Sequence, residues 1–318
     1  MSQAPILPVV FGCAGLALTR EERDFFRQSN PLGLIVFDRN VQNPAQLKRL
    51  IADFRDAVGR KNAPVLVDQE GGRVQRLWPP YWHGLPWART YGDIYPDNPK
   101  KALKMVRGHA ETMAKDLRSV GLNVVCWPCL DVAVPETHDI MAKRCFSDDA
   151  GIVATLGRAA VQGALKNGVM PVVKHIPGYG RTIVDPHARL PVVRAKRSVL
   201  EKSDFAPFRG IAEPVWGMTA HVVYEALDKK RPATLSPVVV GYIREQIGFG
   251  GFLVSDDICM GALGAFGTPV QIAQACIAAG CDAVLHCNGD LAEMKRIARG
   301  LAPMSGESLA RLGSKYVV

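Results

Sequence analysis

Short apolar, β-branched runs alternate along the chain with longer stretches in which apolar residues recur at helical spacing. Eight of the runs are predicted to be strands: Leu7–Phe11, Leu34–Phe37, Val65–Asp68, Val124–Trp127, Met170–Lys174, Gly217–Ala220, Phe252–Ser255 and Ala283–Leu285. Eight helices are predicted between and after them: Thr19–Gln28, Pro44–Val58, Lys100–Val120, Asp149–Asn167, Ser198–Ile211, Pro237–Ile247, Val270–Ala279 and Leu291–Gly300. Strands that alternate with helices favour a parallel sheet, and eight such units predict an α/β fold with a single (β/α)8, TIM-type barrel.

Local signals support individual helices and one continuous domain. Thr19 precedes two glutamates and Ser236 precedes Pro237, as expected at the starts of helices. A doubly wound sheet is the alternative fold, but no glycine-rich dinucleotide fingerprint follows an early strand. No linker or low-complexity segment divides the chain, so we expect one domain over residues 1–318, with Leu77–Pro99 as a long ordered loop.

The composition is that of an ordinary globular protein, with 48% hydrophobic and 22% charged residues, which excludes disordered, collagen-like and coiled-coil classes. No run of 18 apolar residues occurs, so we expect no transmembrane helix and no membrane partner. The apolar segment Ile6–Leu18 contains two glycines and no Lys or Arg precedes it, which argues against a signal peptide. Eight dispersed cysteines favour reduced thiols and therefore a cytoplasmic protein.

The formal net charge is +9, and the basic residues are scattered. Even the densest basic stretch, within residues 194–202, lacks the interleaved aromatic residues of a nucleic-acid-binding surface, so no nucleic-acid partner is expected. The excess charge is either an ordinary feature of a basic protein or an attraction for an anionic substrate.

Polar residues of types used in catalysis or ligand binding follow several predicted strands. In a barrel these positions converge on the mouth at the carboxyl ends of the strands, where active sites are found. A charged group beside a buried strand is costly unless it is paired or used, so five such strand ends favour a polar site: Asp68, Asp131, Lys174 with His175, His221, and Asp256 with Asp257.

The Gly/Pro-rich segment Lys174–Val193 contains a D-x-H pair, Asp185 and His187. Residues two apart in an extended chain point the same way, and Pro186 favours an extended conformation at the aspartate. Asp185 is therefore placed to orient His187 as a general acid/base imidazole. The alternative is a simple pair of surface residues.

Two further segments have more than one interpretation. Asp256 directly follows an apolar strand and fits a nucleophile, a metal ligand or a helix N-cap. The segment Val67–Leu77 holds Asp68, Glu70, Arg73 and Arg76, which suits contacts to substrate hydroxyl and carbonyl oxygens or, alternatively, an internal salt-bridge network.

Metal and redox chemistry are not expected from the sequence. Cys126 and Cys129 form a C-x-x-C, but an apolar strand precedes the pair, no helix begins there and no second cysteine pair follows. The histidines lack the H-x-H or H-E-x-x-H spacing of common metal sites. We therefore expect neither a metal nor a cofactor.

Several motifs in a fixed order make the chain recognisable: VDQEGGRVQRL, GLNVVCWPCLDV, KRCFSDD, KHIPGYGR followed by DPH, MTAHVVYEALD and GFLVSDDICM. Over nearly its whole length the sequence resembles family 3 glycoside hydrolases, specifically the single-domain bacterial β-N-acetylhexosaminidases of peptidoglycan recycling. The resemblance implies a (β/α)8 barrel, in agreement with the strand count. It also implies an exo-acting enzyme that hydrolyses terminal N-acetylglucosamine from cytoplasmic muropeptides carrying anhydro-muramic acid, with retention of configuration.

The resemblance implies a role for each matching residue. Asp256 is the nucleophile that forms a covalent glycosyl intermediate, and His187, assisted by Asp185, is the acid/base. The implied sugar-binding positions are Asp68, Arg76, Arg144, Lys174 and His175.

The sequence departs from the family pattern at Tyr179, where His is common, at Ala142, where Gly is common, and at Pro186, where a small polar residue is common. These changes affect the expected rate and substrate preference, because none removes an implied catalytic group. Three other functions stay open: a phosphorylase that uses the same residues, a muropeptide-binding protein without catalysis, and a Schiff-base aldolase that uses Lys174.

Overall fold

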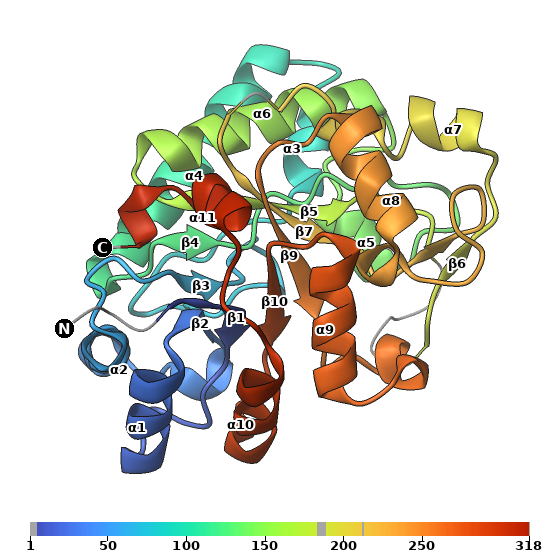
Figure 1. Cartoon of the computed structure of the whole chain (residues 1–318). Coiled ribbons are helices and arrows are strands. Elements are labelled where there is room, and N and C mark those ends of the chain that lie inside the picture. The colour runs from blue at the N-terminus through green and yellow to red at the C-terminus, as the bar shows by residue number, and fades with distance from the viewer. Residues whose placement is uncertain (1–4, 183–188, 212, 318) are drawn as a thin grey trace.

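Eight parallel strands close into a barrel that helices surround (Figure 1). The structure is a computed structural model and describes residues 5–182, 189–211 and 213–317. The barrel strands are β1 (Leu7–Phe11), β2 (Pro31–Val36), β3 (Val65–Val67), β4 (Val124–Val125), β5 (Met170–Ile176), β7 (Trp216–Thr219), β9 (Phe252–Asp257) and β10 (Ala283–His286). Around the barrel they follow the chain order, and β10 pairs with β1 to close it. The predicted TIM-type barrel and its eight strands are confirmed.

The helices cover the outside of the barrel (Figure 1). They are α1 (Arg20–Ser29), α2 (Pro44–Val58), α3 (Arg89–Ile94), α4 (Pro99–Val120), α5 (Asp139–Arg144), α6 (Ala150–Lys166), α7 (Arg197–Lys202), α8 (Pro237–Tyr242), α9 (Pro269–Ala279), α10 (Leu291–Gly300) and α11 (Gly306–Leu312). The two predicted helix starts are confirmed, because the Thr19 hydroxyl accepts the Glu22 N–H and the Ser236 hydroxyl accepts the Val239 N–H.

Helix α7 ends at Lys202, although a helix was predicted over Ser198–Ile211. The buried carboxylate of Asp204 accepts hydrogen bonds from the Ser203 hydroxyl and from the guanidinium of Arg181, and Pro207 lacks the N–H that a continued helix needs. The chain therefore turns after α7 and forms only a short 3-10 turn further on.

Three short helices were not predicted: α3, α5 and α11. A pair of two-residue strands, β6 (Val192–Val193) and β8 (Val223–Tyr224), also lies outside the barrel. The parallel pairing of β6 with β8 joins the chain that follows β5 to the chain that follows β7, at the mouth of the barrel.

The core has two layers. Apolar side chains such as Val10, Ile35 and Phe252 fill the barrel, and a larger apolar layer lies between the strands and the helices. Tyr316 near the C-terminus belongs to the inner layer, and its carbonyl accepts a hydrogen bond from the buried guanidinium of Arg60. Because these contacts close the amino ends of the strands, the carboxyl ends are left to form a site.

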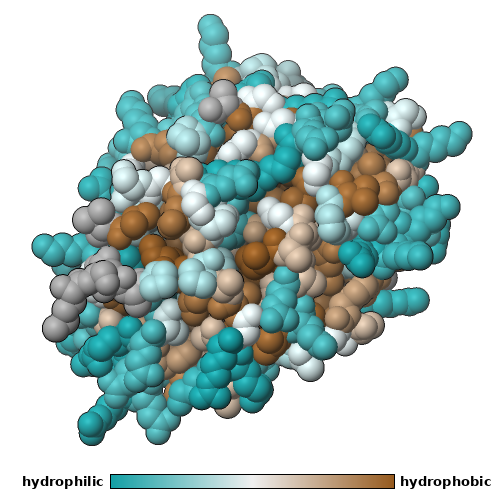
Figure 2. Space-filling view, viewed as in Figure 1, coloured by the Kyte–Doolittle hydropathy of each residue, from teal (hydrophilic) through white to brown (hydrophobic). Residues whose placement is uncertain are grey.

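The outer surface mixes polar and apolar side chains. On the face in Figure 2, hydrophilic side chains surround the outline and hydrophobic atoms are visible between them. Among residues 5–182, 189–211 and 213–317, no helix is both long enough and apolar enough to cross a membrane.

Candidate active site

A cavity of about 340 Å³ opens at the carboxyl ends of the barrel strands. Six of the sequence-predicted site residues line it, namely Asp68, Arg76, Arg144, Lys174, His175 and Asp256. The cavity therefore brings together residues from the segment after β3 and from α5, β5 and β9, which are far apart in the sequence. Apolar side chains complete its wall, among them Phe37, Val74, Ile140, Met141, Met218 and Met260.

Lys174, in the wall of the cavity, links two carboxylates. Its ammonium lies 2.8 Å from Asp68 Oδ1 and 2.7 Å from Glu70 Oε1, and the Lys174 side chain is only 3% exposed. Asp68 also faces the guanidinium of Arg76 at 3.3 Å. A buried ammonium with two carboxylate partners is held in one place, so the network fixes the position of the Asp68 carboxylate.

Glu70 is a buried partner of these lining residues, and the predicted site residues did not include it. Its two carboxylate oxygens accept hydrogen bonds from Arg144 Nη2 at 2.7 Å and Arg144 Nε at 2.9 Å, which is the two-pronged geometry typical of Arg–carboxylate pairs. Glu70 stood in the segment singled out in the sequence, but its partner lies 74 residues away. Nothing in the sequence alone indicates that residues so far apart are paired.

The charged groups of this network shift one another's pKa values. Burial by itself would raise the pKa of Asp68, but the positive charges of Lys174 and Arg76 outweigh it and hold that pKa well below its usual range. The pKa of Glu70 is lowered in the same way, against burial, by Arg144 and Lys174. Burial would lower the pKa of Lys174, yet Asp68 and Glu70 raise it. All of these groups are therefore charged at neutral pH.

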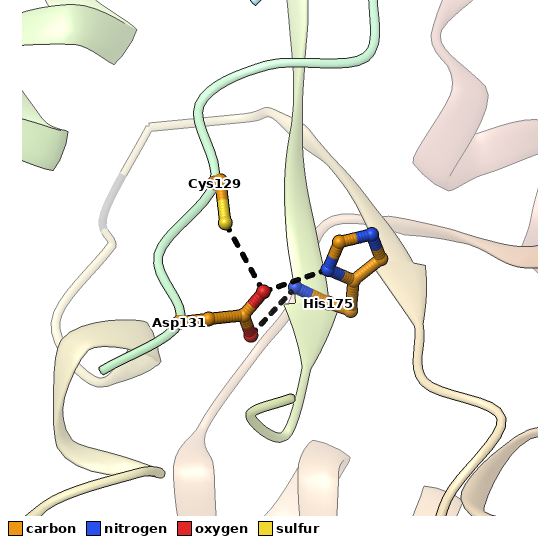
Figure 3. Close-up of side chains that lie close together, drawn as sticks. All are labelled: Cys129, Asp131 and His175. Atoms are coloured by element: carbon orange, nitrogen blue, oxygen red, sulfur yellow. Dashed lines mark hydrogen bonds and ion pairs between the residues drawn. The ribbon is translucent and has the colours of Figure 1, made fainter. Parts of the chain in front are cut away.

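His175 is oriented by a carboxylate beneath the cavity (Figure 3). Asp131 Oδ2 lies 2.7 Å from His175 Nδ1 and accepts the Cys129 thiol at 3.1 Å, while Asp131 Oδ1 accepts the backbone N–H groups of His175 and Tyr179. The side chain of Asp131 is fully buried, and the His175 charge and these donors lower its pKa although burial opposes the shift. Asp131 thus determines the ring orientation of His175, whose Nε2 lies 3.4 Å from Arg144 Nη2.

The register of β5 changes where its side chains enter the cavity. Lys174 pairs with Met218 of β7, but Ile176 pairs with Thr219, so one residue of β5 is extra between them. Successive side chains of a regular strand point to opposite faces. The irregularity accompanies the placement of both Lys174 and His175 in the cavity wall.

Asp256 is the last residue but one of β9 and lines the cavity. Its Oδ1 accepts the N–H of Asp257 at 2.8 Å. The N-cap position of the 3-10 helix after the strand is Met260, and that of α9 is Thr268. Asp256 therefore caps neither helix, and the N-cap interpretation is wrong. The carboxylate remains available to a molecule in the cavity.

Asp257 and His221, which were also predicted at strand ends, make hydrogen bonds within the protein. Asp257 also lines the cavity, but its Oδ1 accepts the backbone N–H groups of Cys259 and Cys287. His221 is buried, and its ring nitrogens lie 2.8 Å from Thr234 Oγ1 and 3.0 Å from the Asp257 carbonyl oxygen. Burial lowers the pKa of His221, so this imidazole supports the chain after β9 as a neutral group.

The D-x-H pair, Asp185 and His187, and the departure Pro186 lie outside the described residues. Thr182, just before them, lines the cavity. The neighbouring Arg181 donates to Asp204 at 2.8 Å, which fixes the chain where it leaves the cavity. Of the other departures, Tyr179 lines the cavity with its ring centroid 5.4 Å from that of His175, and Ala142 lies in α5.

The C-x-x-C cysteines are both buried. Cys126 lies in the apolar interior of the barrel, and Cys129 donates to Asp131. Burial raises the pKa of both thiols, with neighbouring negative charge adding to the shift. Neither thiol is therefore an accessible thiolate.

A TIM-type barrel with carboxylates and their cationic partners gathered at the carboxyl ends of its strands has the form of a barrel hydrolase. Residues 7–308 match the glycosyl hydrolase family 3 N terminal domain. The chain belongs to glycosyl hydrolase family 3 and is a glycoside hydrolase.

Similar proteins extend over most of the chain. A β-hexosaminidase of Bordetella avium is 33% identical over 320 residues, which cover 99% of this chain and 90% of that protein. A β-hexosaminidase of Chromobacterium violaceum is 36% identical over 316 residues, covering 97% and 87%. The crystal structure of NagZ from Neisseria gonorrhoeae in complex with N-trifluoroacetyl-D-glucosamine has a TM-score of 0.88 and 31% identity, covering 98% of this chain and 90% of that one.

Proposed function

We propose that this glycoside hydrolase is a retaining, exo-acting β-N-acetylglucosaminidase. The observation that carries the proposal is the position of Asp256: its carboxylate lines a cavity whose wall also holds Asp68, Lys174 and Arg144, which belong to one ion-pair network. Relatives that are about one third identical over nearly the whole chain are β-hexosaminidases, which supports an N-acetylhexosamine in this cavity.

In the first step, the Asp256 carboxylate attacks C1 of the sugar. The C1–O bond to the leaving group breaks, and its electron pair goes to the leaving oxygen. The protonated imidazole of His187 gives its proton to that oxygen, while Asp185 stabilises the imidazolium. The product of this step is a glycosyl ester on Asp256 and a free alcohol.

In the second step, a water molecule replaces the leaving group. The neutral His187 imidazole accepts a proton from the water, whose oxygen attacks C1, and the ester bond to Asp256 breaks. Two displacements at C1 restore the original configuration. A histidine in place of the usual second carboxylate is suited to both proton transfers, since an unperturbed imidazole has a pKa of about 6.5.

The polar wall suits the hydroxyl and amide groups of one sugar ring. Asp68 is a half-buried, ionised acceptor, and Arg76, Arg144 and Lys174 are donors held in fixed positions. His175, oriented by Asp131, adds a ring nitrogen. Such pre-positioned groups contribute most when they fit the transition state better than the bound substrate.

The charge state of Lys174 opposes the aldolase alternative. A Schiff-base lysine must be a neutral amine, and the pKa of Lys174 is raised by Asp68 and Glu70 although burial opposes this. The ammonium is already paired with both carboxylates, so it is a structural and binding group.

The natural substrate that we propose is a cytoplasmic muropeptide, N-acetylglucosamine linked to anhydro-muramic acid, released during peptidoglycan recycling. An anionic leaving sugar with its peptide suits the net charge of +9. All eight cysteines are free thiols, which supports a reducing compartment such as the cytoplasm.

The first test is incubation with an aryl N-acetyl-β-glucosaminide, with and without phosphate, followed by NMR of the initial product. Initial release of the free β-anomer in both cases is expected. A sugar 1-phosphate formed only with phosphate would move the assignment to a phosphorylase. No turnover of either the aryl substrate or a muropeptide would favour a binding protein that lacks catalysis.

A further inference from the structure

A second group of potential metal ligands lies beside the catalytic cavity. Cys259 follows β9, His286 ends β10 and Glu293 lies in the first turn of α10. One ligand atom from each residue lies within 4.8 Å of the other two. None of the three residues lines the catalytic cavity, so this Cys–His–Glu cluster is separate from it.

One atom of the cluster is without a partner. His286 is fully buried, and its Nε2 lies 2.6 Å from Glu293 Oε1. Its Nδ1 is buried and has no hydrogen-bond partner among the residues that the structure describes. His286 Nε2 is therefore the nitrogen placed to share an ion with Glu293, and Nδ1 lies outside that contact.

Cys259 gives the cluster access to solvent. Cys259 is exposed, whereas the other seven cysteines are buried, so an ion can reach it from solvent. Backbone N–H groups of Asn288 and Cys287 face the sulfur and would stabilise a negative charge on it after an ion displaces the proton.

The other cluster with ligand-type residues is less suited to an ion. In the Cys129–Asp131–His175 group of Figure 3, the two oxygens of Asp131 already accept four hydrogen bonds. All three residues are buried, so an ion would have to displace these donors without access to water. That group orients His175.

We propose that Cys259, His286 and Glu293 form a binding site for a borderline-soft divalent cation, with zinc as the best match. Thiolate, imidazole and carboxylate are the three zinc ligands that proteins use, and a water molecule would complete a tetrahedron. Ligand atoms of such a site are about 3.3 to 3.8 Å apart, so the His286–Glu293 contact must open by roughly 1 Å. On binding, the Cys259 S–H bond breaks, its proton goes to solvent and the sulfur bonds to the metal.

The consequence of binding would be a link between three elements. Cys259 belongs to the chain just after Asp256, and its N–H is bonded to Asp257 Oδ1. A metal held by Cys259 and by the end of β10 and the start of α10 would tie this chain to the barrel. The site would therefore stabilise the folded protein and the segment that carries Asp256.

The test is a titration of chelator-treated, reduced protein with Co²⁺ and then Zn²⁺. We expect one Co²⁺ per chain, the near-ultraviolet absorption of a cobalt–thiolate bond, the intense visible bands of a four-coordinate ion, and displacement by one Zn²⁺. Cys259→Ser should abolish the thiolate band. Glu293→Gln should weaken zinc binding by at least about tenfold, because even residues that only support metal ligands contribute that much.

Two matched variants give the controls. Cys129→Ser changes the thiol of the other cluster, and Glu307→Gln changes a glutamate of α11 that pairs with Arg311 outside both clusters. Both should bind the metal as the unmodified protein does. A thiolate band lost in Cys129→Ser but kept in Cys259→Ser would overturn the proposal, as would one-to-one binding without a thiolate band or no binding at all at micromolar zinc.

Discussion

The ammonium of Lys174 lies 2.8 Å from a carboxylate oxygen of Asp68, and this contact joins β5 to the end of β3 in the wall of the cavity at the mouth of the barrel. Glu70 is 2.7 Å from the same ammonium. One buried cation thus balances two carboxylates that would otherwise repel each other. The binding wall and the stability of the barrel depend on the same contacts, which leads to a testable prediction.

Lys174→Met should destabilise the protein strongly. The substitution keeps an apolar stem but leaves Asp68 and Glu70 with less positive charge, and breaking a buried ion pair from one side costs about 3 to 5 kcal/mol. Urea unfolding followed by circular dichroism would measure the loss. Lys115→Met is the matched control, since Lys115 forms an exposed pair with Glu111 and its removal should change the midpoint little. Equal midpoints for the two variants would contradict the prediction.

The buried carboxylates should also make stability depend on acid pH. The folded pKa of Asp131 is lowered, mainly by His175 against burial, whereas an unfolded aspartate titrates near about 3.9. Below that value the unfolded chain binds protons that the folded protein does not, so the contribution of Asp131 is present above about pH 4 and is lost as the pH falls through the folded pKa.

Asp131→Asn tests this dependence. The variant should be less stable at pH 7, and the difference from the unmodified protein should shrink between about pH 4 and pH 2. Urea midpoints measured over pH 2 to 7 would give both results. Asp97→Asn, at an exposed carboxylate, should show no such convergence. A constant difference at every pH for Asp131→Asn would argue that its carboxylate does not titrate differently in the folded state.

Much of the barrel could be predicted from the sequence because its strands are buried on both faces. Such strands are short continuous apolar runs, as in β1 and β5, and the intervening helices have clear periodicity. Short elements were missed for the opposite reason: α5 has six residues, and β6 and β8 have two each, so no period can be recognised. Their formation depends on contacts with the rest of the fold.

The site was predictable where a polar residue follows a short apolar run. Asp68, Lys174 and Asp256 all do so and all line the cavity. The pairing of Glu70 with Arg144 and the orientation of His175 by Asp131 were not predictable, because both contacts join segments more than 40 residues apart. The sequence indicated which groups face the mouth of the barrel, and the three-dimensional fold decided which of them are paired.

The cysteines should differ sharply in reactivity. Cys259 is exposed and the other seven are buried, so a colourless disulfide reagent that releases a coloured thiolate should titrate one thiol in the folded protein and eight after unfolding. Cys259→Ser should leave none reactive in the folded protein. Rapid reaction of more than one thiol in the native state would mean that at least one of the buried cysteines becomes accessible to solvent.

Asp256→Ala should lower turnover of an aryl N-acetyl-β-glucosaminide by a factor of at least about 1,000, because no carboxylate remains to form the glycosyl ester. Azide should restore reaction, since a small anion can enter the vacated space, attack C1 directly and release the aryl group. A single displacement gives the α-glycosyl azide, which NMR distinguishes from the β-anomer. Near-normal turnover without azide would exclude Asp256 as the nucleophile.

His187→Ala should affect substrates according to their leaving groups. A general acid is needed most when the departing oxygen is basic, so hydrolysis of a muropeptide should fall much more than cleavage of a dinitrophenyl glycoside, whose leaving group departs without a proton. Initial rates for formation of the glycosyl enzyme, measured with both substrates, give the comparison. Asp256→Ala is the control, because loss of the nucleophile should reduce both substrates alike. Equal losses in His187→Ala would show that His187 supports the site without donating the proton.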